Sequence, residues 1–184
     1  MATHRSDECR LVKPGRTLKA QYLAMARDFS EAGETAHSRH LVEDDGFDAF
    51  VDELERQARG ENLQPDHVPQ TTYWLLRSDG AILGTGRIRH YLTPSLEAWG
   101  GHIGYDIRPT ERRKGYGTLI LSLLLREARD LALRRALLTC DDENVGSARV
   151  IERNGGVLAD RVPTLDTDRL GRRYWIEVER GEAH

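Results

Sequence analysis

The sequence predicts a mixed α/β fold in a single domain, with one mixed sheet and helices on both of its faces. The chain has 184 residues, a length typical of one domain. We assign residues 1–184 to that domain, with the clearest core at 70–180. Segments with the two-residue alternation of strands and segments with helical spacing follow the order β-α-α-β-β-β-α-β-α-β-β. An apolar run without alternation at residues 136–140 indicates a strand buried on both faces.

Composition narrows the class of protein. Charged residues make up 31% and apolar residues 39% of the chain, as in globular proteins. The net charge of −3 gives no overall positive field for nucleic acid or acidic lipid, so we expect neither partner. Two widely spaced cysteines, Cys9 and Cys140, do not make a disulfide framework, so we expect a protein of the reducing cytoplasm. No segment has the length of an apolar membrane span, and the first residues lack a signal-peptide pattern.

The first third of the chain predicts one strand and two helices. Residues 9–13 read as a short strand, and apolar positions then recur at helical spacing from Thr17, a candidate N-cap, to Gly33. A second amphipathic helix covers residues 47–58 and ends at Gly60.

The rest of the chain predicts a hairpin and then alternating elements. Two strands flank a Ser-Asp-Gly turn, as in a β-hairpin, and residues 92–100 read as a loop. A long helix runs through Leu131, and a short helix ends at an Asn-Gly-Gly cap. The strands are expected, in chain order, at residues 71–77, 81–91, 102–107, 136–140, 157–160 and 172–179. The short helix is expected at residues 145–153.

Three cations and two glycines stand where the long helix must begin: Arg112, Arg113, Lys114, Gly115 and Gly117. A helix N-terminus carries unpaired N–H groups and a partial positive charge, and glycine lets a ligand approach the backbone closely. This pattern is typical of a phosphate site. The dinucleotide fingerprint does not fit, because an isoleucine occupies the position of its third glycine, and no P-loop motif is present. The alternative is an ordinary strand-to-helix turn with exposed cations.

The segment 102–160 resembles the GNAT superfamily of N-acetyltransferases. Their cofactor motif, Q/R-x-x-G-x-G/A at the start of a helix, is matched at every fixed position by residues 112–117. Asn144, Ser147 and Gly155 have the spacing of the second motif of the superfamily, and the order of elements also agrees. The resemblance implies a GNAT-like acyltransferase fold and an enzyme that moves an acetyl group from acetyl-CoA to an amine, without a metal.

The resemblance also implies where acetyl-CoA binds. The cofactor is expected in a gap between the fourth and fifth strands, with its pyrophosphate on the glycine turn and its pantetheine arm along the fourth strand. Asn144 would contact the pantetheine or acyl end; the alternative is a plain N-cap, and one residue can fill both roles, with Ser147 as the partner of that cap. The residues expected to bind the cofactor are Asp106, Ile107, Arg108, Arg112, Arg113, Lys114, Gly115, Tyr116, Gly117, Thr118, Asn144 and Ser147.

Acyl transfer to an amine also needs an acid for the leaving thiolate. In many members of the superfamily that acid is a tyrosine seven residues after the asparagine, and here Ile151 occupies the position. Tyr105, Tyr116 and Tyr174 are the remaining candidates near the gap. The missing tyrosine leaves open a second function, a non-catalytic module of the same fold that binds or senses acyl-CoA.

A base must take the proton of the acceptor amine, because an alkylammonium with a pKa near ~10.4 cannot attack a thioester. His102 and Glu97 are the titratable groups near the start of the fourth strand. His102 suits a base at neutral pH, and the alternative is a partly buried structural histidine. Glu97 is the second candidate, and the alternative is a solvated carboxylate.

The acceptor is expected to be a small cationic amine. Residues 31–70 hold eleven acids and three Lys or Arg residues. The acids on the second helix, among them Asp45, Asp48, Asp52 and Glu55, border the acceptor site in the resembled superfamily. A solvated helix face is the alternative. The sequence leaves the oligomeric state open, with a homodimer as one alternative.

Two further signals in the sequence are weak. His37 and His40 have helical spacing, but no third metal ligand accompanies them. Cys140 stands beside two carboxylates, which disfavour a reactive thiolate, so we expect it to be a small buried filler.

Overall fold

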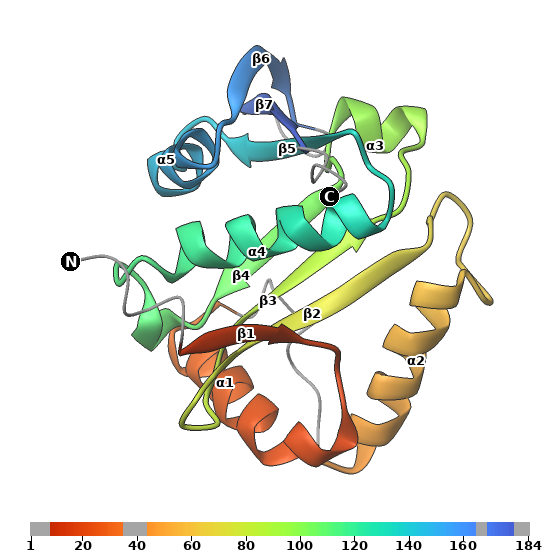
Figure 1. Ribbon diagram of the computed structural model, residues 1–184, viewed down its shortest axis with the longest axis vertical. Coiled ribbons are helices and arrows are strands. Elements are labelled where there is room, and N and C mark those ends of the chain that lie inside the picture. Colours follow the sequence, from red (N-terminus) through yellow and green to blue (C-terminus); the bar gives the residue numbers. More distant parts are fainter. Residues whose placement is uncertain (1–7, 35–43, 165–168, 179–184) are drawn as a thin grey trace, which may run out of the picture.

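The strands form two sheets, which corrects the expectation of one continuous mixed sheet (Figure 1). The computed structural model describes residues 8–34, 44–164 and 169–178. The first sheet has the order β1-β2-β3-β4, with strands Cys9–Val12, Gln70–Arg77, Ile82–Arg89 and Ile103–Ile107. The second has the order β5-β7-β6, with strands Arg135–Asp141, Leu170–Glu177 and Val157–Pro163. Neighbouring strands within both sheets run antiparallel.

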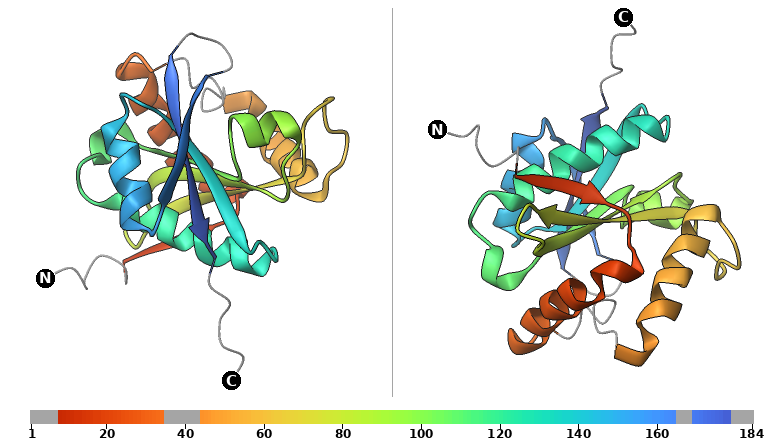
Figure 2. Two further views of the ribbon diagram at one scale, coloured as in Figure 1. Left: turned by 90° about the horizontal axis from the view of Figure 1, so that it is seen from above. Right: turned by 60° about the horizontal axis from the view of Figure 1, so that its bottom comes forward.

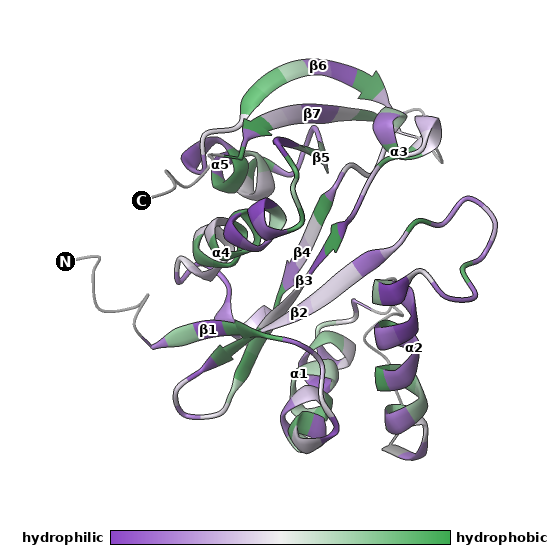
Figure 3. Cartoon of the chain, turned by 45° about the vertical axis from the view of Figure 1, so that its right-hand side comes forward, coloured by the Kyte–Doolittle hydropathy of each residue, from purple (hydrophilic) through white to green (hydrophobic). Residues whose placement is uncertain are grey.

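The helices cover opposite faces of the first sheet. Helices α1 (Lys19–Glu31) and α2 (Phe47–Arg59) lie on one face, and α4 (Tyr116–Asp130) and α5 (Val145–Arg153) lie on the other side (Figures 2 and 3). Strand β2 contributes side chains to the hydrophobic cores on both faces of the sheet, because its side chains alternate. Leu75 packs into the α4 core, whereas Trp74 packs with Tyr22 and Phe47 from the two N-terminal helices.

A glycine lets α4 lie close against the first sheet. A Cβ atom at Gly86 would lie only 2.5 Å from Cδ1 of Leu124. Leu124 itself is fully buried, as are its helical neighbours Ile120 and Leu121. The apolar stripe that predicted this helix therefore forms the contact between α4 and the sheet.

Two local predictions need correction. The first helix begins at Lys19 after a 3-10 turn at Arg16–Leu18, and Thr17 lies inside that turn and does not cap the helix. The stretch expected as a loop contains a short helix, α3 (Pro94–Ala98). Thr93 caps α3 by accepting a hydrogen bond from the Leu96 N–H at 3.3 Å. A capping threonine followed by proline at the first helical position is a helix start signal, and it was readable in the sequence.

The two sheets meet at the start of β4, where His102 bonds twice to one residue of β5. The His102 N–H donates to the carbonyl oxygen of Leu137 at 2.7 Å, and the Leu137 N–H donates to Nδ1 of His102 at 2.9 Å. Gly101 has φ +63, and a side chain there would collide with the same carbonyl. Beyond this junction, β4 and β5 are not neighbours in either described sheet, so the outer edge of β4 has no strand partner there. We use the word gap for this separation of β4 from β5.

The junction predicts a pH-dependent stability. His102 is only 8% exposed, and burial, followed by the charges of Arg89 and Arg135, lowers its pKa to about 4. The unfolded chain therefore binds this proton below about pH 6.5, while the folded protein binds it only near pH 4. Stability that is present above pH 6.5 should be lost as the pH falls, by about 2 kcal/mol between pH 7 and pH 5.

Urea unfolding of the wild type and of His102→Asn checks this. Asparagine offers an oxygen to the Leu137 N–H but does not titrate, so the variant should lose less stability than the wild type over the same pH range. Equal pH dependence in the two proteins would contradict the assignment.

Candidate functional site: a glycine turn, a gap and a cavity around β4

The glycine turn has the form of an anion site. Gly115 precedes α4 with φ +89, a left-handed conformation that favours glycine. Within the described part of the chain, no side chain caps the helix. The N–H groups of the first helical residues, Tyr116, Gly117 and Thr118, precede the first possible intrahelical bond. The turn therefore presents backbone donors and the positive end of the helix dipole to a ligand.

Most of the cations at this turn hold the turn itself in place. Arg112 donates two hydrogen bonds to Glu34 at 2.5 and 2.7 Å, and its Nε donates to the Ile107 carbonyl at 3.0 Å. Lys114 donates to Glu111 at 3.0 Å and to a backbone carbonyl. Arg113 is exposed, and within the described ranges it makes no ion pair. Two of the three cations predicted to bind a phosphate thus hold the turn in this structure, and their contact with a cofactor stays a prediction.

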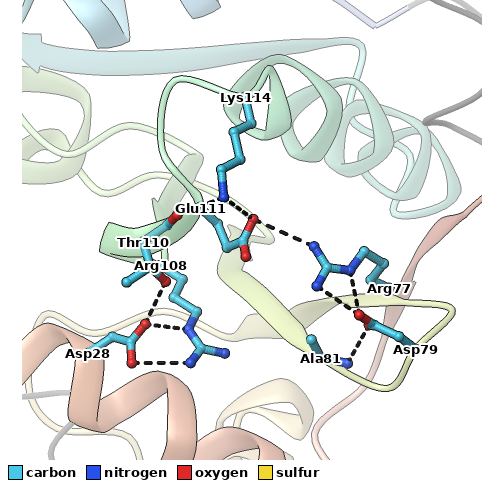
Figure 4. Close-up of polar contacts among 8 residues, drawn as sticks. All are labelled: Asp28, Arg77, Asp79, Ala81, Arg108, Thr110, Glu111 and Lys114. Carbon is cyan, nitrogen blue, oxygen red and sulfur yellow. Dashed lines mark hydrogen bonds and ion pairs between the residues drawn. The ribbon is translucent and has the colours of Figure 1, made fainter.

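A second set of ion pairs ties the turn to α1 and to the β2–β3 hairpin (Figure 4). Arg108 donates to Asp28 at 2.6 and 3.1 Å, and Thr110 donates to the same carboxylate at 2.6 Å. Glu111 lies between Lys114 and Arg77, at 3.0 and 3.5 Å. Arg108 is therefore a structural residue through its side chain, and only its backbone remains available to a cofactor.

Tyr105 of β4 points into the gap toward α5. Its hydroxyl lies 3.3 Å from Oγ of Ser147, and burial raises its pKa to about 12. Ser147 and Ile151 are four residues apart on α5 and so share one helix face. The phenol therefore reaches α5 one turn before the position where the superfamily carries its tyrosine.

The other gap residues have structural roles. Asn144 caps α5 by accepting the Ser147 N–H at 3.0 Å, which is the capping alternative for this pair. Tyr116 is buried at the start of α4, and Tyr174 donates to Glu152 at 3.0 Å. Burial raises the pKa of the Cys140 thiol to about 11, as expected of a buried filler.

The two candidate bases lie in different surroundings. His102 has Nδ1 engaged by Leu137 and a pKa of about 4, so the structural role is favoured over a base that titrates near neutral pH. Its role as a base stays a prediction. Glu97 is exposed on α3, and its backbone carbonyl accepts a hydrogen bond from Arg173 at 3.0 Å. This placement favours the solvated alternative for Glu97.

A cavity of about 610 Å³ lies on the opposite side of the first sheet, beneath α2. Its floor is formed by the α2-facing side chains of β2 and β3 and by Gly104 of β4. Its apolar wall comes from α2 and the following loop. The lining includes Phe50, Leu54, Leu63, Trp74, Thr85 and Arg87. The gap and the cavity thus reach β4 from two sides.

Only part of the predicted acidic segment reaches this cavity. Asp45, Asp48, Asp52 and Glu55 are absent from its lining, whereas Glu53 and Asp66, two of the eleven acids, contribute to it. Asp48 and Asp52 instead contact Arg16. Those four acids therefore give no support to a cationic acceptor, and the charge of the acceptor stays a prediction.

Sequence reasoning missed Arg87 and Trp74, both of which line the cavity. The sequence did carry a signal for Arg87, because Thr85, Arg87 and Arg89 stand at alternate positions of β3 and so share a face of the sheet. Which face of the sheet carries the cavity depends on the packing of α2, which the strand pattern does not reveal.

No three His, Cys, Asp or Glu side chains in the described ranges are grouped to hold a metal ion. His37 and His40 lie outside the described residues. None of the described helices combines the length and apolar character needed to cross a membrane.

Comparison with known proteins gives a family match. A family model described as acetyltransferase (GNAT) domain matches residues 26–157. No curated protein matches the chain.

Solved structures share the fold at low sequence identity. RimL, an alpha-N-protein acetyltransferase of a ribosomal protein in complex with coenzyme A, is 16% identical with a TM-score of 0.67, covering 94% of this chain and 96% of that one. MccE, a microcin self-immunity acetyltransferase in complex with acetyl-CoA and AMP, is 16% identical with a TM-score of 0.66 and covers 93% of both chains. A GNAT-family acetyltransferase from Bacillus anthracis is 17% identical with a TM-score of 0.64, and the match covers 94% of this chain and 96% of that one.

The ionic contacts of the turn predict the effect of removing Asp28. The substitution Asp28→Asn leaves the partly buried Arg108 without its carboxylate, and it should lower the free energy of unfolding by about 1–3 kcal/mol. Urea unfolding near neutral pH measures this. Asp48→Asn, at an exposed carboxylate 3.9 Å from Arg16, is the matched control and should change stability by less than about 0.5 kcal/mol. An equal loss in both variants would show that the tether contributes nothing.

Proposed function

The chain belongs to the GNAT family of acetyltransferases, and from that premise we propose that it transfers the acetyl group of acetyl-CoA to an amine bound in the cavity beneath α2. One observation carries the proposal: an uncapped glycine turn and a gap lie on one side of β4, and a cavity of about 610 Å³ reaches β4 from the other. Donor and acceptor could therefore meet across a single strand. A cavity of this size is typical of a small-molecule site.

The residues of the gap fit acetyl-CoA. The N–H groups of Tyr116, Gly117 and Thr118 would hold the pyrophosphate, and the exposed Arg113 would add a cation beside it. The outer edge of β4 would pair with the pantetheine arm as an added strand does. The Ile107 carbonyl is already bonded to Arg112, so the arm would rely on the other edge groups of residues 105–107.

Acetyl-CoA supplies a thioester that an uncharged amine attacks. Tyr105 is the group best placed to donate a proton to the leaving sulfur, because its hydroxyl lies at the gap and its raised pKa keeps it protonated. Ser147 would orient that hydroxyl. The alternative of a non-catalytic module was based on Ile151, and the Tyr105 phenol one helical turn away supports an enzyme instead.

We assign removal of the proton from the acceptor amine to water in the open cavity. Glu53 is a poor base, because its hydrogen bonds from Gln57 and Arg56 lower its pKa. We therefore place no protein base at this step, and we retain His102 as the residue that positions the start of β4.

A substitution in the turn tests the cofactor site. A Cβ atom at Gly117 would lie 3.2 Å from Cγ2 of Val150 and 4.0 Å from the Tyr105 ring. Gly117→Glu should therefore crowd the gap, place a negative charge at the phosphate site and abolish acetyl-CoA binding measured by calorimetry. Gly15→Glu, where nothing lies within 4 Å, is the matched control and should bind as the wild type does. Unchanged binding by Gly117→Glu would refute the site.

The acid is tested by Tyr105→Phe. Loss of the hydroxyl should lower kcat by about 10²–10⁴-fold, while acetyl-CoA affinity in calorimetry stays within a few fold. Because the pKa is about 12, the wild type should show no alkaline loss of kcat from this group below about pH 10. Tyr91→Phe, at an exposed tyrosine, is the control. A Tyr105→Phe protein with normal kcat would exclude Tyr105 as the acid.

A further inference from the structure

We propose that the acceptor amine carries a free carboxylate, as an amino acid does, and that Arg87 binds this carboxylate on the floor of the cavity. The inference rests on the proposed function and adds to it the chemical class of the acceptor. It replaces the cationic acceptor expected from the acids of α2.

Arg87 lies where the floor of the cavity meets β4. It pairs in register with Gly104, and its guanidinium covers that glycine: a Cβ atom there would lie 3.0 Å from Nη2 and 3.1 Å from Cζ. Any side chain at residue 104 would push the guanidinium away. The glycine therefore lets a cation lie flat against the strand that separates the cavity from the gap.

Among the described residues, no carboxylate or carbonyl pairs with the Arg87 guanidinium. Neighbouring Arg89 donates to the carbonyls of Gly100 and Gly101 at 3.1 and 2.7 Å, and Arg108 and Arg112 pair with carboxylates. Within the part of the chain that the structure describes, Arg87 makes no hydrogen bond or ion pair, although it is only partly exposed. A half-buried guanidinium without a partner is costly, and a carboxylate is the ligand that matches its planar, bidentate geometry.

A hydroxyl lies on the same face of the floor. Thr85 lines the cavity and shares a face of β3 with Arg87. Trp74 also lines the cavity, but its indole N–H, which has no acceptor in the described ranges, is itself shielded from solvent. A guanidinium with a hydroxyl on the same face is complementary to an anionic group and not to the ammonium of a simple alkylamine.

The wall of the cavity suits the rest of an amino acid. Asp66 contributes negative charge on the side of the loop after α2, where an ammonium group is attracted, and Glu53, already paired with Arg56, also lines the cavity. Phe50, Leu54 and Leu63 contribute apolar surface for a side chain. Opposite charges on floor and wall favour a dipolar acceptor over one that carries positive charge alone.

Matched acceptor series test the proposal. Acetylation would be measured with the common amino acids, their carboxamides and the corresponding decarboxylated amines, using acetyl-CoA as donor. The wild type should favour at least one amino acid over its amide in kcat/KM by about 10- to 100-fold, the effect of one charge-assisted pair. Arg87→Gln should bring that ratio close to one by slowing only the acid, and Arg87→Lys should restore part of it. Arg126→Gln, at an exposed arginine of α4, should leave the ratio unchanged.

The outcomes separate this inference from the function on which it rests. Turnover of amides or decarboxylated amines at rates equal to the acids supports an acetyltransferase and overturns the role of Arg87. An Arg87→Gln protein that acetylates all three series more slowly by the same factor would also overturn that role.

If no amine is acetylated, the proposed function fails, and calorimetry on the coenzyme A complex then decides the inference. Amino acids that bind more tightly than their amides only when Arg87 is present support it, and binding of neither series overturns it.

Discussion

Two hydrogen bonds between His102 and Leu137 join the sheets at one end of β4. Because Nδ1 must accept, the ring has to be neutral, and burial enforces that state at physiological pH. The rest of the site depends on this junction. β4 is held next to β5 by the residue just before its first position and is not paired with β5 beyond it, so the outer edge of β4 has no partner among the described strands.

β4 separates two sites because successive side chains of a strand point to opposite faces. Tyr105 faces α5 and the gap, while its neighbour Gly104 faces the cavity and lies beneath the Arg87 guanidinium. The Tyr105 side chain covers one face of β4, and the backbone of Gly104, which has no side chain, forms the other, so the two faces differ in chemistry. Acyl donor and acceptor need no channel between distant sites in such an arrangement.

The cations near β4 divide into those that build the site and those that remain for ligands. Arg108, Arg112 and Lys114 are neutralised by carboxylates from α1, from the residues that follow it and from the turn itself, which fixes the turn and the end of β4. Arg113 at the turn and Arg87 in the cavity make no ion pair within the described residues. The number of cations near the glycine turn therefore does not equal the number that remain available to bind a phosphate.

The sequence by itself determined the family, the order of the main elements and the glycine turn, because these depend on local spacing: glycines before an apolar helix stripe, and alternation in the strands. Only the tertiary structure decided the roles of single side chains. Whether His102 titrates near neutral pH depends on its contact with Leu137, 35 residues away in the chain. Whether Arg87 faces the cavity and Arg112 faces Glu34 depends on how α1 and α2 pack against the sheet. Strand and helix patterns carry no information about that packing, because charge pairing and burial arise from segments that meet only in the folded chain.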